Sequence, residues 1–188
     1  MTWAEVAARK LWARLGKPEP PVDVGAACRV LGIELWIVSC GSALFDAVYT
    51  PRTRDGRRLV TVNGALSRER QRFSVAHELG HALLAGHAAQ TAGAAWNLER
   101  SPRRETEANR FAAELLMPKL LLVREPRRLV PPVKELAARY LVSQEAMRIR
   151  LIQLGLMPLC LDEETDVQKE AMGIKDAGEN QDRASEAP

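Results

Sequence analysis

The sequence predicts an α+β protein that is mostly helical, with a small antiparallel β-sheet and, after it, a helix-turn-helix-like pair of helices. Three observations support this fold class. Apolar residues recur at helical spacing in several segments, one short region alternates β-rich residues, and turn residues separate the two patterns. The chain has 188 residues, 46% of them hydrophobic, which is enough for one compact domain with small appendages.

Two helices are expected first. Residues 2–15 place apolar side chains at helical spacing, with Thr2 as a candidate N-terminal cap and Gly16 as a stop. Prolines after Gly16 interrupt this pattern, and it resumes over residues 22–30 with Asp23 near its start. Each segment therefore predicts an amphipathic helix that packs on the rest of the protein.

A small sheet is expected next. Residues 33–38 alternate in β-rich residues, and residues 44–49 follow a turn. The run Arg54-Asp55-Gly56-Arg57 is a strong hairpin signal, and a short strand follows at residues 59–62. Together these segments predict an antiparallel sheet.

Two longer helices are expected in the middle of the chain. Ser67 is a candidate cap for a helix that continues to residue 84 or 85. After a stretch without clear periodicity, Ser101-Pro102 indicates the start of another helix over about residues 103–117, which Pro118 terminates.

The C-terminal part has a different organisation. A proline-rich linker precedes two short helices, at residues 133–140 and 144–154. Residues 162–188 hold nine acidic and three basic side chains without apolar periodicity, so we expect them to be disordered. The predicted organisation is therefore a core domain over residues 1–125, a helical subdomain over 126–161 and an acidic tail over 162–188.

Composition excludes several classes of protein. Cys28, Cys40 and Cys160 are odd in number and lack Cys-x-x-Cys spacing, which argues against a disulfide framework. No apolar run reaches membrane-spanning length and no secretory signal begins the chain, so a soluble cytoplasmic protein is expected. The formal charge is +3, and the acidic tail leaves a basic body that could attract an acidic partner, although a solvated charged face explains it as well.

The segment His77-Glu78-Leu79-Gly80-His81 carries the strongest chemical signal. Residues four apart lie above one another on a helix, so His77 and His81 can direct both imidazoles at one metal ion. Glu78 projects from a neighbouring position, from which its carboxylate can reach a metal-bound water as a general base. Gly80 has no side chain, so another backbone or a substrate can come close. Such a motif also arises by chance on surface helices, but two of the chain's three histidines lie here.

The next long helix offers a third ligand, which a catalytic zinc ion requires beside one open position. Glu105 shares a helical face with Ala108, Asn109 and Ala112, and these small residues allow close approach to the first helix. Glu105 can then bind the ion while Asn109, one turn later, orients a ligand.

Two alternatives stay open at this point. Spacing does not fix the rotation of the helix, so Glu107 is the alternative third ligand, although it shares a charged face with Arg103, Arg110 and Glu114 that we expect to be solvated. His87 lies beyond the predicted helix end and is expected to be a surface or loop residue.

Two linked motifs in this order resemble the ImmA/IrrE metallopeptidase family. They are Arg72-Phe73-Ser74-Val75-Ala76-His77-Glu78-Leu79-Gly80-His81-Ala82-Leu83-Leu84 and Glu105-x-x-Ala108-Asn109-x-Phe111-Ala112-Ala113-x-Leu115-Leu116-Met117-Pro118. The similarity covers about residues 1–160. It implies a zincin-like core in which His77, His81 and Glu105 bind zinc and Glu78 is the catalytic base.

The resemblance also implies a function. Family members are site-specific endopeptidases that cut a helix-turn-helix repressor, which relieves repression in stress responses or mobile-element induction. Manganese or iron could replace zinc in such a site. The sequence does not identify the group that stabilises the oxyanion, and Tyr49 and Tyr140 are candidates by chemistry alone.

A binding module without proteolysis is the competing function. The helical pair has the helix, short turn and helix of a DNA-binding unit, and Arg148 and Arg150 could meet phosphates. Leu141 occupies the place where a glycine often makes such a turn. A protein partner is therefore expected, and direct DNA binding and membrane association are not.

Overall fold

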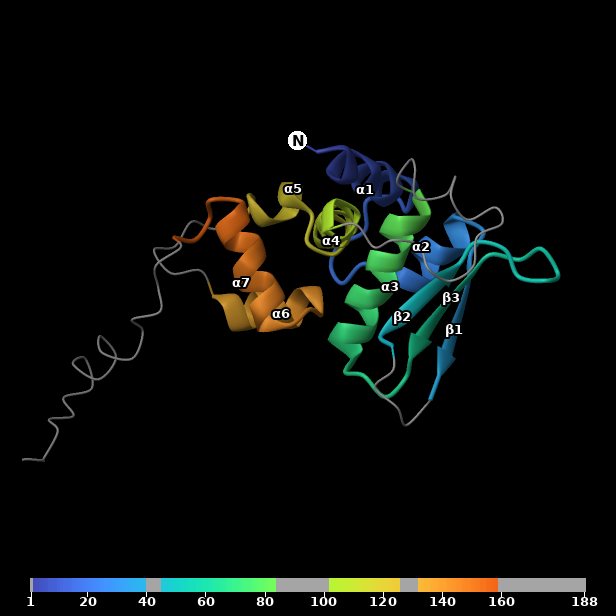
Figure 1. The fold of residues 1–188 in the computed structure, drawn as a ribbon. Coiled ribbons are helices and arrows are strands. Elements are labelled where there is room, and N and C mark those ends of the chain that lie inside the picture. The colour runs from blue at the N-terminus through green and yellow to red at the C-terminus, as the bar shows by residue number, and fades with distance from the viewer. Residues whose placement is uncertain (1, 40–44, 84–101, 126–131, 159–188) are drawn as a thin grey trace, which may run out of the picture. The chain divides into compact units, whose positions relative to one another are not determined.

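The computed structural model describes residues 2–39, 45–83, 102–125 and 132–158 (Figure 1). Over these residues the fold is mixed, with seven helices and one three-stranded sheet. Residues Met1–Met157 form one compact unit. The mostly helical α+β class that the sequence predicts is thus confirmed in outline.

The first two helices form in the segments where the sequence predicts them. In α1 (Trp3–Arg14) the Thr2 hydroxyl accepts from the Glu5 N–H at 3.3 Å, and the Glu5 carboxylate accepts from the Thr2 N–H at 2.6 Å. In α2 (Val24–Val30) the Asp23 carboxylate accepts from two N–H groups of the first turn, at 2.8 and 3.0 Å. These bonds satisfy backbone donors that a helix start otherwise leaves without partners.

The sheet contains β1 (Glu34–Val38), β2 (Ala47–Thr50) and β3 (Leu59–Asn63) in the order β1-β3-β2 (Figure 1). β2 and β3 pair antiparallel, as the hairpin signal predicts, and Gly56 turns the hairpin with a φ of 83°. β1 and β3, however, pair parallel.

The expectation of an antiparallel sheet is therefore wrong for one of the two strand pairs. The hairpin returns β3 to the space between β1 and β2, and β3 then runs in the direction of β1. β3 takes the central place because it buries Val60 and Val62, whereas the end of β1 is exposed. A hairpin signal fixes the direction of β3 relative to β2 and leaves open on which side of β2 it lies.

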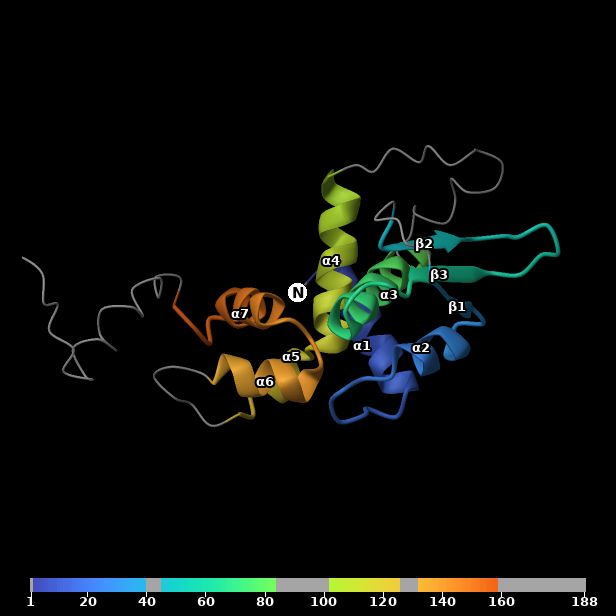
Figure 2. The same cartoon turned by 90° about the horizontal axis from the view of Figure 1, so that it is seen from below.

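The helix α3 (Arg68–Leu83) lies between the sheet and α4 (Pro102–Leu116), as Figures 1 and 2 show. The Ser67 hydroxyl accepts from the Arg70 N–H at 3.3 Å, which agrees with its predicted role as a cap. α4 begins with proline at its first position, where the missing N–H costs nothing. These two helices carry all the candidate metal ligands of the sequence.

Two further helices match the predicted pair, and one helix was not predicted. α5 (Lys119–Leu122) is a single turn after Pro118, too short to show a period. α6 (Val133–Tyr140) and α7 (Gln144–Gln153) follow, and the Ser143 hydroxyl caps α7 by accepting from the Ala146 N–H at 3.1 Å. Between them Leu141 takes the left-handed conformation, with a φ of 52°, at the position where glycine is common.

A buried ion network joins α1, α4 and α7 and corrects two expectations. Glu114 was expected on a solvated face, and Arg150 was a candidate for phosphate contact under the competing function, but their side chains are only 1% and 3% exposed and they pair with each other. Arg9 Nε also bonds Glu114 Oε1 at 2.6 Å, and Arg150 Nε donates to the Met117 carbonyl oxygen at 3.2 Å. A charged residue on a helical face that is otherwise solvated can thus be buried where partners from distant segments neutralise its charge.

Several expectations concern residues outside the described part. They are the loop before residue 102, His87, Cys40, Cys160 and the acidic tail. Both predicted domain boundaries, at residues 125/126 and 161/162, also touch such residues and stay predictions. Among the helices that the structure describes, none has the length and apolar character needed to cross a membrane.

Candidate metal centre

α3 and α4 bring His77, His81 and Glu105 together. One nitrogen from each imidazole and one carboxylate oxygen lie within 4.8 Å of one another. His77 Nε2 is 3.2 Å from Glu105 Oε2, and His81 Nε2 is 3.5 Å from Glu105 Oε1. The two Nε2 atoms are 3.0 Å apart, and the rings meet edge to face with an interplanar angle of 75°. Three donors from two helices therefore converge on one point.

The donor set fits a divalent metal ion. Two imidazoles and one carboxylate are ligands that zinc takes in catalytic sites, and the same set suits manganese or iron. All three side chains are half-buried, between 15% and 27% exposed, so water can still reach the centre. His77, His81 and Glu105 are therefore the residues of the described chain that could hold a metal.

Asn109 supports this centre from α4, as the sequence predicts. Its Oδ1 lies 2.9 Å from His77 Nδ1. When Nδ1 carries the hydrogen and donates to Asn109, the lone pair of the imidazole is on Nε2, the atom that faces His81 and Glu105. Asn109 thus selects the tautomer and the ring orientation that metal binding requires.

Gly80 explains how the two helices come close enough. A Cβ atom at Gly80 would lie 3.1 Å from Ala108 Cα and 3.2 Å from two atoms of Phe111. The backbone of α4 therefore occupies the space that a side chain would fill, which is one of the two uses the sequence suggested for this glycine.

Glu107 is not brought to the histidines. Within the described chain, the cluster that could hold a metal contains Glu105 and omits Glu107. Glu107 Oε1 instead lies 3.7 Å from Arg103 Nε, one turn earlier on the same helix.

Glu78 lines the same pocket as the three candidate ligands. This pocket has a volume of about 400 Å³, and its other lining residues include Phe45 and Asp46 just before β2, Ala47 at the start of β2, and Phe73 and Ser74 on α3. The Glu78 side chain is buried, and its Oε2 accepts a hydrogen bond from the Tyr49 backbone N–H at 2.9 Å. A carboxylate beside the metal centre is the arrangement that a general base for water requires.

Neither tyrosine that the sequence offered as an oxyanion donor has its hydroxyl in this pocket. The Tyr49 hydroxyl accepts from Arg58 Nε at 3.0 Å. Tyr140 is buried in α6, and this burial raises the pKa of its hydroxyl to about 12.

Two features near the pocket were not foreseen. Asp46, at its rim, binds the Arg70 guanidinium through both carboxylate oxygens, at 2.8 and 3.0 Å. The Tyr49 amide bonds Glu78 across 29 residues of sequence. A backbone amide has no residue-type signature, so only the hairpin signal, which places a strand here, could have pointed to it.

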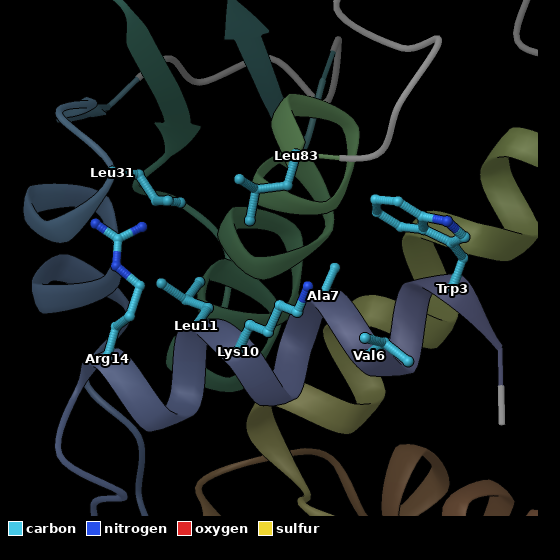
Figure 3. A pocket seen from close by; sticks show the side chains of 8 residues that line it. All are labelled: Trp3, Val6, Ala7, Lys10, Leu11, Arg14, Leu31 and Leu83. Carbon is cyan, nitrogen blue, oxygen red and sulfur yellow. The ribbon is translucent and has the colours of Figure 1, made fainter.

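A second, larger hollow shares none of its described lining residues with the first pocket (Figure 3). It has a volume of about 500 Å³ and lies along α1, with Leu31 and Leu83 on its opposite wall. Its described lining contains the basic side chains of Lys10 and Arg14 but no carboxylate or imidazole. The part of the lining that the structure describes therefore offers no group for metal-assisted chemistry.

Comparisons with known proteins concern the fold and the family of this chain. A solved structure of a Mycobacterium tuberculosis transcriptional regulator is similar, with a TM-score of 0.58 and 20% identity over 79% of this chain and 46% of that one. The chain thus spans about half the length of that protein, and the likeness concerns the fold.

No curated protein matches. The family model of the IrrE N-terminal-like domain, a peptidase family, matches residues 28–152. Since this match covers more than half of the sequence, the chain belongs to the IrrE N-terminal-like peptidase family.

Proposed function

We propose that this protein is a zinc-dependent, site-specific endopeptidase that cleaves a helix-turn-helix transcriptional repressor. The observation that carries the proposal is the convergence of His77, His81 and Glu105 beside Glu78 in one pocket, within a chain of a peptidase family. Relief of repression would belong to a stress response or to mobile-element induction, and a repressor substrate would place the activity in the cytoplasm.

The residues of the site divide the work of peptide hydrolysis. His77, His81 and Glu105 would hold the ion, and Asn109 would keep the His77 ring in the tautomer that binds it. A bound zinc ion supplies Lewis-acid chemistry, because it polarises the scissile carbonyl and lowers the pKa of its water to about 7. Glu78 takes a proton from the attacking water at a carboxylate oxygen and passes it to the leaving amine nitrogen.

A cleavage assay tests the proposal directly. The purified protein is incubated with a helix-turn-helix repressor in the presence of zinc, with a chelator, or as the Glu78→Ala and Glu78→Gln variants. We expect two repressor fragments, with one cut site by mass spectrometry, only for the zinc-loaded wild-type protein. The Glu78→Gln protein keeps its zinc and leaves the repressor intact, because it has lost only the base. An intact repressor under every condition would contradict the proposal for that pair.

The second candidate function is a repressor- or DNA-binding module without proteolysis. The helix, turn and helix formed by α6 and α7 favour it. Against DNA binding, Arg150 is buried against Glu114, which removes one of the two arginines that could have contacted phosphates. An assay of DNA-duplex binding by the Glu78→Gln protein at several salt concentrations distinguishes the two functions. Tight, salt-dependent binding would favour the DNA-binding module over the peptidase.

A further inference from the structure

The carboxylate of Glu78 is held by a strand as well as by its own helix. The Tyr49 N–H, on β2, donates to Glu78 Oε2 at 2.9 Å, and the Glu78 side chain is only 7% exposed. Few water molecules therefore compete for this oxygen, and a hydrogen bond to a charged group in such surroundings is strong.

The pairing of β2 explains why this N–H is available. Residues of an antiparallel pair alternate between positions that bond the partner strand and positions that point away from it. Asp46 occupies a bonding position, because its carbonyl oxygen accepts from the Asn63 N–H at 2.9 Å. In the observed register Val48 and Thr50 then also bond β3, and Tyr49 directs its N–H outward from the edge of the sheet.

The side chain of Tyr49 is bonded elsewhere, which fixes the residue without involving the site. Its hydroxyl accepts from Arg58 Nε, and Arg58 also donates to the Leu31 carbonyl oxygen at 2.9 Å. Tyr49 thus contacts the candidate base through its backbone alone.

We infer that the backbone amide of Tyr49 is the positioning group for Glu78, which makes the orientation of the base depend on β2. With Oε2 bonded to the amide, rotation of the carboxylate is restricted, and the carboxylate keeps one orientation at the pocket that it lines. This inference rests on the proposed function, in which Glu78 is the base, but the contact itself can be tested without a substrate.

Hydrogen exchange of the Tyr49 amide measures the contact. An outward amide of an edge strand exchanges fast unless a side chain accepts its hydrogen. In the zinc-loaded, ¹⁵N-labelled protein we expect the Glu78→Ala variant to accelerate exchange at Tyr49 by about tenfold or more, the effect of losing one charge-assisted hydrogen bond. Val48 and Thr50 should keep their rates, and Glu78→Gln, which retains an acceptor oxygen, should preserve protection at Tyr49.

Two results would overturn the inference. One is an unchanged exchange rate at Tyr49 in Glu78→Ala. The other is equal acceleration at Val48, Tyr49 and Thr50, because this would show that the whole strand has loosened.

Proline substitution tests the consequence for catalysis. Tyr49→Pro removes the outward N–H, and proline is tolerated on edge strands where no ladder bond is lost. On a repressor that the wild-type protein cuts, we expect kcat to fall by about tenfold or more while KM and zinc content change less than about twofold. Val48→Pro is the contrast, since it removes a ladder bond and should lower the thermal midpoint. An unchanged kcat in folded Tyr49→Pro would contradict the inference.

The exchange rates and the cleavage assay together distinguish failure of this inference from failure of the proposed function. If no repressor is cut but Tyr49 protection depends on Glu78, the contact stands and the peptidase function fails. If the wild-type protein cuts and Tyr49 protection is independent of Glu78, this inference alone fails.

Discussion

At the scale of single residues, the candidate site depends on which carboxylate of α4 faces α3. Glu105 lies 3.2 and 3.5 Å from the two imidazoles, whereas Glu107 lies beside Arg103. Two residues along a helix turn a side chain by about 200°, so these two glutamates cannot both face the same neighbour.

The first prediction separates these two glutamates. Loss of a residue that only supports a metal ligand typically weakens metal binding by about 10- to 100-fold. Glu105→Gln should weaken zinc binding by more than this, because it removes a charged ligand itself. Glu107→Gln, the matched control, should bind zinc as the wild-type protein does. Competition against a chromophoric chelator gives both constants. Weaker binding in Glu107→Gln and normal binding in Glu105→Gln would reverse the assignment.

At the residue scale, the sequence predicts which groups lie together where the information is local. The spacing of His77 and His81, and of Glu105 and Asn109, follows from helix geometry, so the structure brings these groups together as expected. Glu114 was misassigned because its partners, Arg9 and Arg150, lie 105 and 36 residues away. Nothing in the helical period distinguishes a buried ion pair from a solvated charge.

At the scale of elements, the site depends on the distance between α3 and α4. The close contact of Gly80 with Ala108 and Phe111 sets this distance. Replacing glycine by alanine inside a helix usually stabilises the helix by about 1 kcal/mol. At position 80, however, the added methyl group would push the backbones of α3 and α4 apart.

The second prediction follows from this contact. Gly80→Ala should lower the free energy of unfolding by about 1–3 kcal/mol, the usual cost of overpacking, and should weaken zinc binding because Glu105 moves with α4. Gly25→Ala in α2 is the control, since its Cβ would meet only side-chain atoms of Asp23 and Arg29. Chemical denaturation measures stability, and a zinc titration measures affinity. A gain in stability for Gly80→Ala would contradict this explanation.

Helix boundaries were predictable because caps and stops are local signals. Thr2 and Ser67 each accept a hydrogen bond at the helix start where they were expected, and Asp23 and Ser143 accept one at the starts of α2 and α7. The parallel pairing of β1 with β3 was not predictable, because strand order depends on which strand buries most in the assembled fold.

At the scale of the whole molecule, the Glu114 network connects helices from both ends of the described chain. A buried ion pair adds little net stability, yet loss of one partner leaves an uncompensated buried charge. The ion pair of Arg139 Nη2 and Glu125 Oε2, 2.8 Å apart, is exposed to solvent and can be compared with the buried network.

The third prediction concerns this network. Glu114→Ala should lower the free energy of unfolding by about 3–5 kcal/mol, because Arg150 stays buried without its counter-charge. The double variant Glu114→Leu/Arg150→Leu should recover most of that loss. Glu125→Ala, the exposed control, should cost at most about 1 kcal/mol. A double-mutant cycle by chemical denaturation measures the coupling, and additive effects would contradict it.

The Glu114 carboxylate also limits how far the chain can be shortened from its N-terminal end. The family match begins at residue 28, after α1, but Arg9 of α1 bonds Glu114 inside the matched region. Removing α1 would withdraw one counter-charge from a buried acid and would uncover the apolar surface of α4 that α1 covers. The matched segment is therefore shorter than the compact unit Met1–Met157, and α1 is a structural part of that unit.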